Sequence, residues 1–125
     1  INSEVADKLQ VLNQKLALAG VSWEITEAWP PTLPSCGPGQ ASGNCHKDPC
    51  HPDGTCIDGS LRGPSTGQPT AIRTFIQSAS TSGLRAVYEV PNATRRDQLV
   101  AGGVPSSSIQ VITGINGEHL SVYNT

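Results

Sequence analysis

The stretch from Cys50 to Asp58 places a histidine and an aspartate seven residues apart across a turn. In a straight strand, side chains alternate with a period of two, so His51 and Asp58 would point to opposite faces. The Pro-Asp-Gly sequence at 52–54 favours a turn, so the chain can bend after His51 and bring Asp58 back toward it. A converging imidazole and carboxylate are two of the three protein ligands of an open zinc site. The pattern predicts either this metal pair or a hydrogen bond between the two residues that braces the turn.

All four cysteines of the chain lie in one segment rich in glycine and proline. Eight, four and five residues separate them in turn, whereas structural zinc sites usually bring cysteines in C-x2-4-C pairs. We therefore expect two disulfides, formed in an extracellular, periplasmic or cell-surface environment. Pairing the first cysteine with the second and the third with the fourth would close two short loops, and zinc or free thiols are the alternatives. The four are Cys36, Cys45, Cys50 and Cys56.

The length and charge of the chain narrow the class of protein. Its 125 residues suit a single domain, 1–125, with a long cysteine-rich loop at 30–50. A formal net charge of −2 provides no basic surface for nucleic acid, and no segment approaches the ~20 apolar residues of a membrane span. The chain begins at Ile1 without a leader-like segment, which is expected of a mature product after leader removal or of a trimmed chain.

Apolar periodicity and turn signals divide the rest of the chain into helices and strands. Pro69 opens a helix that Gly83 closes, and Asn92 caps a further helix. The Asn116-Gly117 dipeptide predicts a hairpin between the last two strands. The order indicates an α+β domain with a mainly antiparallel sheet and helices packed on one face. The expected helices are 3–19, 69–83 and 92–100, and the expected strands are 21–28, 55–58, 84–90, 109–113 and 119–123, with a loop at 59–68.

The motif around the turn resembles that of a known zinc fold. His51-x-x-Gly54-x-Cys56-x-Asp58 is similar to the H-x-x-G-x-A-x-D motif of the D-Ala-D-Ala carboxypeptidase and Hedgehog-type family. The leading helix and the strand-like segment 21–29 before the long loop fit the same family, so the resemblance spans most of the chain, from residue 9 to residue 122. It implies a Hedgehog/D-Ala-D-Ala-peptidase-like fold in which His51 and Asp58 bind zinc.

The family resemblance also implies where the third zinc ligand should be. It is a histidine on a C-terminal strand, in an E-x-x-H or H-x-H pattern that also supplies the catalytic base. In this chain Ser121 takes the ligand position, whether the alignment follows Glu118 or His119. A hydroxyl is a weak zinc donor compared with imidazole or carboxylate. Both alignments therefore leave the metal site one ligand short.

Other residues are candidates to complete the site. His119 points to the same face of its strand as Ser121, so it is the candidate third ligand; otherwise it is a polar remnant or a surface residue. Glu118 or Glu89 would act as the base, although Glu89 is alternatively a solvent-facing residue on the open side of the sheet. The family also uses a cationic side chain to hold a carboxylate or oxyanion. Three arginines are available for that role, and nothing in the spacing selects one: Arg62, Arg73 and Arg85.

A site that is one ligand short predicts a role without catalysis. We expect a secreted structural or assembly subunit, such as an extracellular fibre or pilus-like filament, whose partners are copies of itself arranged head to tail. The alternatives are a zinc-dependent D-Ala-D-Ala carboxypeptidase acting on peptidoglycan, and a module that binds the cell wall or a surface glycan. The first role needs no cofactor, whereas the peptidase requires zinc. Asn92-Ala93-Thr94 is a glycosylation sequon in an exported protein, or otherwise a helix N-cap.

Overall fold

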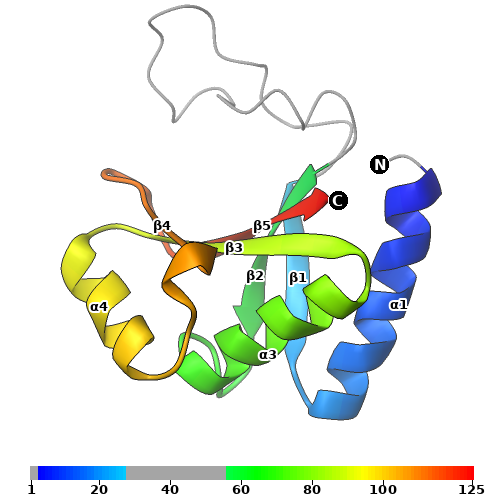
Figure 1. Ribbon diagram of the computed structural model, residues 1–125, viewed down its shortest axis with the longest axis horizontal. Coiled ribbons are helices and arrows are strands. Elements are labelled where there is room, and N and C mark those ends of the chain that lie inside the picture. The colour runs from blue at the N-terminus through cyan, green and yellow to red at the C-terminus, as the bar shows by residue number, and fades with distance from the viewer. Residues whose placement is uncertain (1–2, 28–55) are drawn as a thin grey trace, which may run out of the picture.

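The computed structural model describes residues 3–27 and 56–125 of the chain (Figure 1). These residues form the expected α+β arrangement, with a five-stranded, mostly antiparallel sheet packed against helices. The elements in chain order are α1 (Ser3–Ala19), β1 (Ser22–Glu27), β2 (Cys56–Arg62), α3 (Pro69–Thr81), β3 (Leu84–Val90), α4 (Ala93–Ala101), the 3-10 turn η1 (Ser106–Ser108), β4 (Ile109–Val111) and β5 (His119–Asn124).

The strand order is β1-β2-β5-β3-β4, so the last strand of the chain lies in the middle of the sheet. Among the described strands, only β3 and β4 are parallel. Strand β5 pairs antiparallel with β2 on one side and with β3 on the other. Side chains of three strands that are well separated in the sequence therefore become neighbours on each face of the sheet.

One face of the sheet is buried under the helices. Side chains of α1, α3 and α4 join alternate side chains of the strands in a single hydrophobic cluster. Fully burying a large apolar side chain stabilises a fold by roughly 1.5–3 kcal/mol, so this cluster makes the largest favourable contribution to the free energy of folding. Its strand residues include Ile57 and Leu61 of β2, Leu84, Ala86, Tyr88 and Val90 of β3, and Leu120 and Val122 of β5. The intervening residues of these strands point to the other face.

The helices form where their sequence patterns predicted them. Helix α3 starts at Pro69, whose missing N–H costs nothing in the first turn. Helix α4 starts after Asn92, whose side chain accepts a hydrogen bond from the Arg95 backbone N–H at 2.8 Å. This contact confirms Asn92 as an N-cap. On α1 the residues at helical spacing are all buried: Val5, Leu9, Leu12 and Leu16.

Two predictions about the strands are wrong. Strand β2 continues to Arg62, so the first part of the loop expected at 59–68 is strand. The segment 112–118, in which Asn116-Gly117 is a bend, connects β4 to β5 but makes no hairpin, because β4 pairs in parallel with β3 and β5 lies between β2 and β3. In this central position Leu120 and Val122 are 0% and 1% exposed. An isolated hairpin could not bury them to that extent.

Strand β2 continues through Gly59 to Arg62 in antiparallel pairing with β1, and Trp23 of β1 packs across Gly59. A Cβ atom at Gly59 would lie 2.4 Å from atoms of the Trp23 ring, so a side chain there would require β1 to move. The Trp23 ring meets Phe75 edge-on, with ring centroids 4.8 Å apart, and its indole N–H donates to Asn13 Oδ1 at 2.8 Å. Gly59 therefore leaves room for the Trp23 ring to pack against the core, while the preceding residue, Asp58, points to the opposite face.

Candidate metal centre

Four polar side chains meet on the face of the sheet that points away from the helices. Asp58 of β2 lies directly opposite Ser121 of β5, and Glu89 of β3 lies directly opposite His119 of β5. His119 and Ser121 share a face because they are two residues apart on one strand. The central position of β5 therefore assembles the cluster from three strands.

The four side chains are in direct contact. His119 Nε2 lies 2.5 Å from Glu89 Oε2, and Ser121 Oγ lies 2.7 Å from the same oxygen and 2.9 Å from Asp58 Oδ1. One ligand atom from each of Asp58, Glu89 and His119 lies within 4.8 Å of the other two. Glu89 is 8% exposed and Ser121 is 6% exposed, whereas Asp58 and His119 are partly exposed. The cluster is therefore buried at Glu89 and Ser121 and accessible to solvent at Asp58 and His119.

The cluster carries more negative than positive charge. When its three titratable groups are ionised, two carboxylates oppose a single imidazolium. The Ser121 hydroxyl has one proton and two carboxylate oxygens within hydrogen-bonding distance, so it can donate to only one of them at a time. Carboxylates that are close together in a partly buried site are stabilised by an added proton or a cation. The arrangement is electrostatically suited to bind a cation.

The surroundings of His119 favour its protonated form. The hydrogen bond to Glu89 raises the pKa of His119 to about 9, and the negative charges of Glu89 and Asp58 act in the same direction. Burial opposes this shift in the pKa, and the Gly117 carbonyl, 3.3 Å from His119 Nδ1, supports it. The imidazole is therefore protonated at neutral pH in the metal-free protein. A metal ion that binds Nε2 must displace this proton.

The donor atoms fit a zinc-class ion. One imidazole nitrogen and two carboxylates are ligand types that zinc takes, and three protein ligands is the number found in catalytic sites. Zn²⁺ bonds of about 2.0–2.1 Å place its tetrahedral ligands roughly 3.3 Å apart. The donor atoms lie within 4.8 Å of one another, so the most distant ones would have to approach each other by at most about 1.5 Å, and the closest pair, His119 Nε2 and Glu89 Oε2, would have to separate. The Gly117 carbonyl meets a further requirement, because ligating histidines usually donate their second ring N–H to such a group.

The structure tests some of the predicted site residues and leaves others open. Asp58 and His119 are brought together, as the metal-site prediction requires. The solvent-facing alternative for Glu89 is wrong, because this side chain is buried against His119. His51 lies outside the described residues, so its role as a ligand stays a prediction. Cys56 is buried and disulfide-bonded, and the predicted pairing of the four cysteines also lies outside the described residues.

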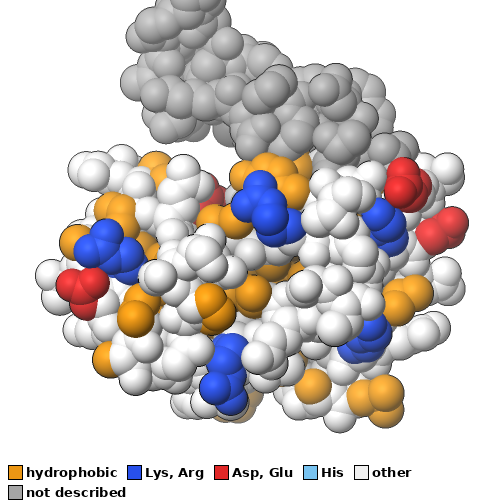
Figure 2. Space-filling view, viewed as in Figure 1, with side chains coloured by type: hydrophobic (Ala, Val, Ile, Leu, Met, Phe, Trp, Pro, Cys, Tyr) orange, Lys and Arg blue, Asp and Glu red, His pale blue; other side chains and the backbone are white. Residues whose placement is uncertain are grey.

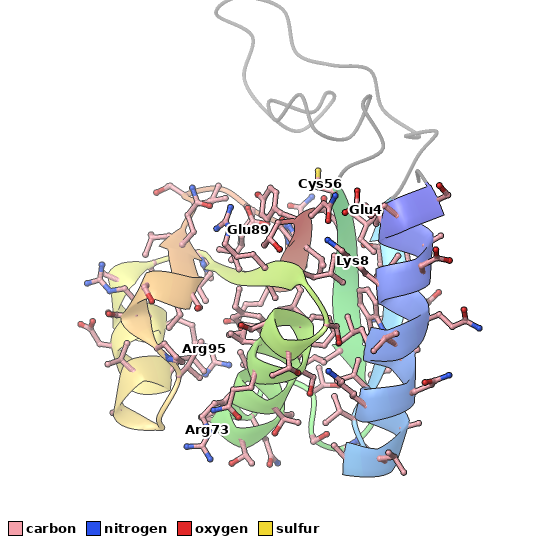
Figure 3. All side chains as sticks on the ribbon, turned by 45° about the vertical axis from the view of Figure 1, so that its right-hand side comes forward. Glu4, Lys8, Cys56, Arg73, Glu89 and Arg95 are labelled. Carbon is pink, nitrogen blue, oxygen red and sulfur yellow. The ribbon has the colours of Figure 1, made fainter. Side chains whose placement is uncertain are left out.

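Glu118, the other predicted base, points away from this cluster. Its Oε1 accepts a hydrogen bond from the Tyr88 hydroxyl at 2.7 Å, and its Oε2 accepts one from Arg95 Nε at 2.7 Å. Figure 3 shows Arg95 beside α3 and α4, on the opposite side of β3 from Glu89. Both carboxylate oxygens of Glu118 are therefore engaged on the helix-covered face, whereas Glu89 contacts the histidine directly.

The three candidate arginines lie in different surroundings. Arg62 is on the same face of β2 as Asp58 and pairs with Glu24 at 2.9 Å. Arg85 is on the same face of β3 as Glu89, with its guanidinium 4.5 Å from the centre of the Tyr123 ring. Arg73 is on α3, away from the cluster (Figure 3). On the face seen in Figure 2 the basic side chains are dispersed among polar and apolar ones and form no continuous patch.

The role of Ser121 in the cluster was missed from the sequence. Period-two alternation around Leu120 and Val122 predicts that Ser121 faces away from the core, but it does not indicate what the hydroxyl contacts. That contact depends on the register between β2, β5 and β3. The isolated carboxylate of Glu89 in an otherwise apolar strand was the stronger signal, because a buried charge requires a partner.

Comparison with known proteins identifies no relative. At a significant level, the chain matches no protein-family model, no curated protein and no solved structure. Among the described residues, no helix is both long enough and apolar enough to cross a membrane.

Proposed function

We propose that the protein binds a zinc-class divalent ion at Asp58, Glu89 and His119 and acts as a metal-dependent peptide hydrolase. The observation that supports this proposal best is the position of Glu89. The sequence left the metal site one ligand short at Ser121, and β3 supplies a carboxylate 2.5 Å from His119 that completes a set of three donors. His51, predicted from the turn motif, would be an additional ligand or a base.

The burial of Glu89 supports a functional reason for its presence. A carboxylate that is 8% exposed loses most of its hydration, and this loss is costly unless the charge is paired. An apolar residue at this position of β3 would avoid that cost. The pairing with His119 offsets it and keeps both side chains at the cluster. A site that must hold a metal ion is a direct reason to retain both groups.

Each residue of the cluster has a separate task in this proposal. Asp58, Glu89 and His119 hold the ion, and the Ser121 hydroxyl donates to one of the carboxylates and limits its rotation. The Gly117 carbonyl accepts the Nδ1 proton of His119, which leaves Nε2 available as a ligand. A bound zinc ion would supply a Lewis acid and a water molecule of lowered pKa.

The substrate class rests on the family resemblance of the turn motif. That resemblance favours D-Ala-D-Ala termini of peptidoglycan stem peptides, and the disulfide at Cys56 fits a periplasmic or extracellular location. Arg62 and Arg85 point to the same face as the cluster, each four residues along its strand from Asp58 and Glu89 respectively, so both are candidates to hold a substrate carboxylate. Arg85 makes no ion pair with a described residue, so its guanidinium is the better candidate.

The experiment is a zinc titration of the chelator-treated protein, followed by an assay for cleavage of a peptide ending in D-Ala-D-Ala. We expect one zinc per chain and cleavage that a chelator abolishes. Asp58→Asn and Glu89→Gln should weaken zinc binding at least tenfold. Glu24→Gln, which changes an exposed, ion-paired carboxylate on β1, is the control and should bind zinc like the unaltered protein. Absence of zinc binding by the unaltered protein would refute the proposal.

A second candidate is the structural subunit expected from the sequence. Ser121 favours it, because its hydroxyl lies between the carboxylates at the position where the family that the turn motif resembles has a histidine. The metal-free cluster is already held together by hydrogen bonds. This candidate requires head-to-tail filaments, visible by electron microscopy of the native material, and a protein that binds no zinc. Binding of peptidoglycan or a surface glycan without cleavage would instead indicate a binding module.

A further inference from the structure

We propose that Glu118 is a positioning residue: held by Arg95 and Tyr88 on one face of the sheet, it sets the orientation of His119 on the other. The inference rests on the proposed metal site, because its purpose is to present His119 Nε2 to a metal ion. It replaces the role of catalytic base that the sequence suggested for Glu118.

The anchor is a compact hydrogen-bonded group that joins distant parts of the chain. Glu118 accepts hydrogen bonds from the Tyr88 hydroxyl and from Arg95 Nε, each at 2.7 Å. The same guanidinium donates through a second nitrogen to the Gly67 carbonyl, also at 2.7 Å. The group therefore ties the residue that precedes β5 to β3, to α4 and to the loop that follows β2. We call these three side chains, Tyr88, Arg95 and Glu118, the anchor.

Burial makes the anchor stronger than an ordinary surface ion pair. The side chains of Arg95 and Glu118 are each 23% exposed, and Tyr88 is 4% exposed. Charge-assisted hydrogen bonds in a partly buried site are shorter and stronger than neutral ones. The ion pair between Arg62 and Glu24 joins the same atom types, but its side chains are 50% and 64% exposed. Exposed pairs of that kind contribute little to stability or rigidity.

The link from Glu118 to the cluster runs through two neighbouring residues. Glu118 directly precedes His119, the first residue of β5. Glu118 contacts Tyr88 and Arg95 on the helix-covered side, whereas His119 contacts Glu89 on the other face of the sheet. Gly117, on the other side of Glu118, offers the carbonyl that lies 3.3 Å from His119 Nδ1. Fixing Glu118 restricts the peptide groups before and after it. The anchor thereby holds the Gly117 carbonyl where it can accept the Nδ1 proton.

Without the anchor, β5 would be less well defined where the site is assembled. Pairing with β3 begins at His119, opposite Glu89, and Asn116-Gly117 shortly before it form a bend outside the sheet. Gly117 in that bend has no side chain to restrain it. A ring that is free to rotate at His119 would lose its contact with Glu89 and, with it, the arrangement of ligand atoms. Groups that orient ligating histidines in this way commonly change metal affinity 10- to 100-fold when they are altered.

The test compares three variants by zinc affinity, measured in competition with a chromophoric chelator. Glu118→Gln replaces one acceptor oxygen by an NH2 group and removes the negative charge, so one hydrogen bond of the anchor is lost and the other is weakened. Tyr88→Phe removes only the hydrogen bond from the tyrosine, and Glu24→Gln disrupts the matched exposed ion pair. We expect a 10- to 100-fold loss of zinc affinity for Glu118→Gln, a smaller loss for Tyr88→Phe, and no change for Glu24→Gln. Thermal unfolding in chelator shows whether each variant is folded at the temperature of the binding assay.

A second readout needs no metal. In chelator, nuclear Overhauser contacts between the His119 ring and the Glu89 side chain should be present in the unaltered protein and weakened in Glu118→Gln. Unchanged contacts and unchanged zinc affinity in a folded Glu118→Gln protein would overturn the inference, as would an equal loss in Glu24→Gln. If the unaltered protein binds no zinc, the proposed function fails, and the nuclear Overhauser contacts alone then decide whether Glu118 positions His119.

Discussion

The contact between Glu89 and His119 yields a prediction that can be tested on the metal-free protein. The pKa of His119 is about 9, against an ordinary value of 6.5, and its largest cause is the hydrogen bond to Glu89. At about 1.4 kcal/mol per pH unit, this difference corresponds to at most about 3 kcal/mol of stability. The His119 side chain is 27% exposed, so solvent screening reduces this figure only in part. Glu89→Gln replaces the carboxylate by an uncharged amide and should remove most of the effect.

The pH dependence of the effect follows from the direction of the shift. Below pH 6.5 the histidine is protonated in both the folded and the unfolded chain, so the pair contributes its full stabilisation. Between pH 6.5 and about 9 the unfolded chain loses the proton while the folded protein keeps it, and the contribution falls. Glu89→Gln should therefore destabilise the protein most at pH 6. Its destabilisation should be smaller at pH 9.5 by up to about 3 kcal/mol.

Two measurements check this prediction. Urea unfolding in chelator, at pH 6 and at pH 9.5, compares the free energy of unfolding of the unaltered protein and Glu89→Gln. Titration of the histidine ring signals by NMR gives the pKa directly, with His119 assigned from a His119→Gln variant. A pKa near 6.5 for His119 in the unaltered protein would refute the reasoning. The same conclusion would follow if the cost of Glu89→Gln differed by less than about 1 kcal/mol between the two pH values.

Three further predictions concern the cluster and its support. Ser121→Ala removes a buried hydroxyl that donates to a carboxylate, so the free energy of unfolding in urea at pH 7 should fall by about 1.5–3 kcal/mol. An unchanged unfolding midpoint would show that this hydrogen bond does not stabilise the fold. Gly59→Ala places a methyl group 2.4 Å from the Trp23 ring and should lower the free energy of unfolding by about 1–3 kcal/mol. The control is Gly117→Ala, because a Cβ atom there has nothing within 4 Å; this variant should unfold at nearly the same urea concentration as the unaltered protein. The apparent zinc affinity should rise about tenfold per pH unit between pH 6.5 and 8, because the ion displaces the proton of His119; a chelator competition series with no slope would contradict the assignment of His119 as a ligand.

Much of the local structure could be predicted from the sequence because it depends on local patterns. The apolar spacing on α1, the proline that opens α3 and the cap at Asn92 act within a few residues, and all three helices form where they were expected. The strand at Leu84–Val90 was also predicted with its observed bounds. The alternation of side chains correctly placed His119 and Ser121 on one face of the same strand.

The composition of the cluster could not be predicted, because it depends on which strands are neighbours. The Asn116-Gly117 signal describes a turn and does not specify the strands that the flanking segments join. Burial of Leu120 and Val122 is more complete in the centre of the sheet than in a hairpin at its edge, and this preference places β5 between β2 and β3. The sequence alone determined that His119 and Ser121 share a face. Only the tertiary structure decided that Asp58 and Glu89 lie on either side of them, because hydrophobic burial across the whole sheet sets the order and register of the strands.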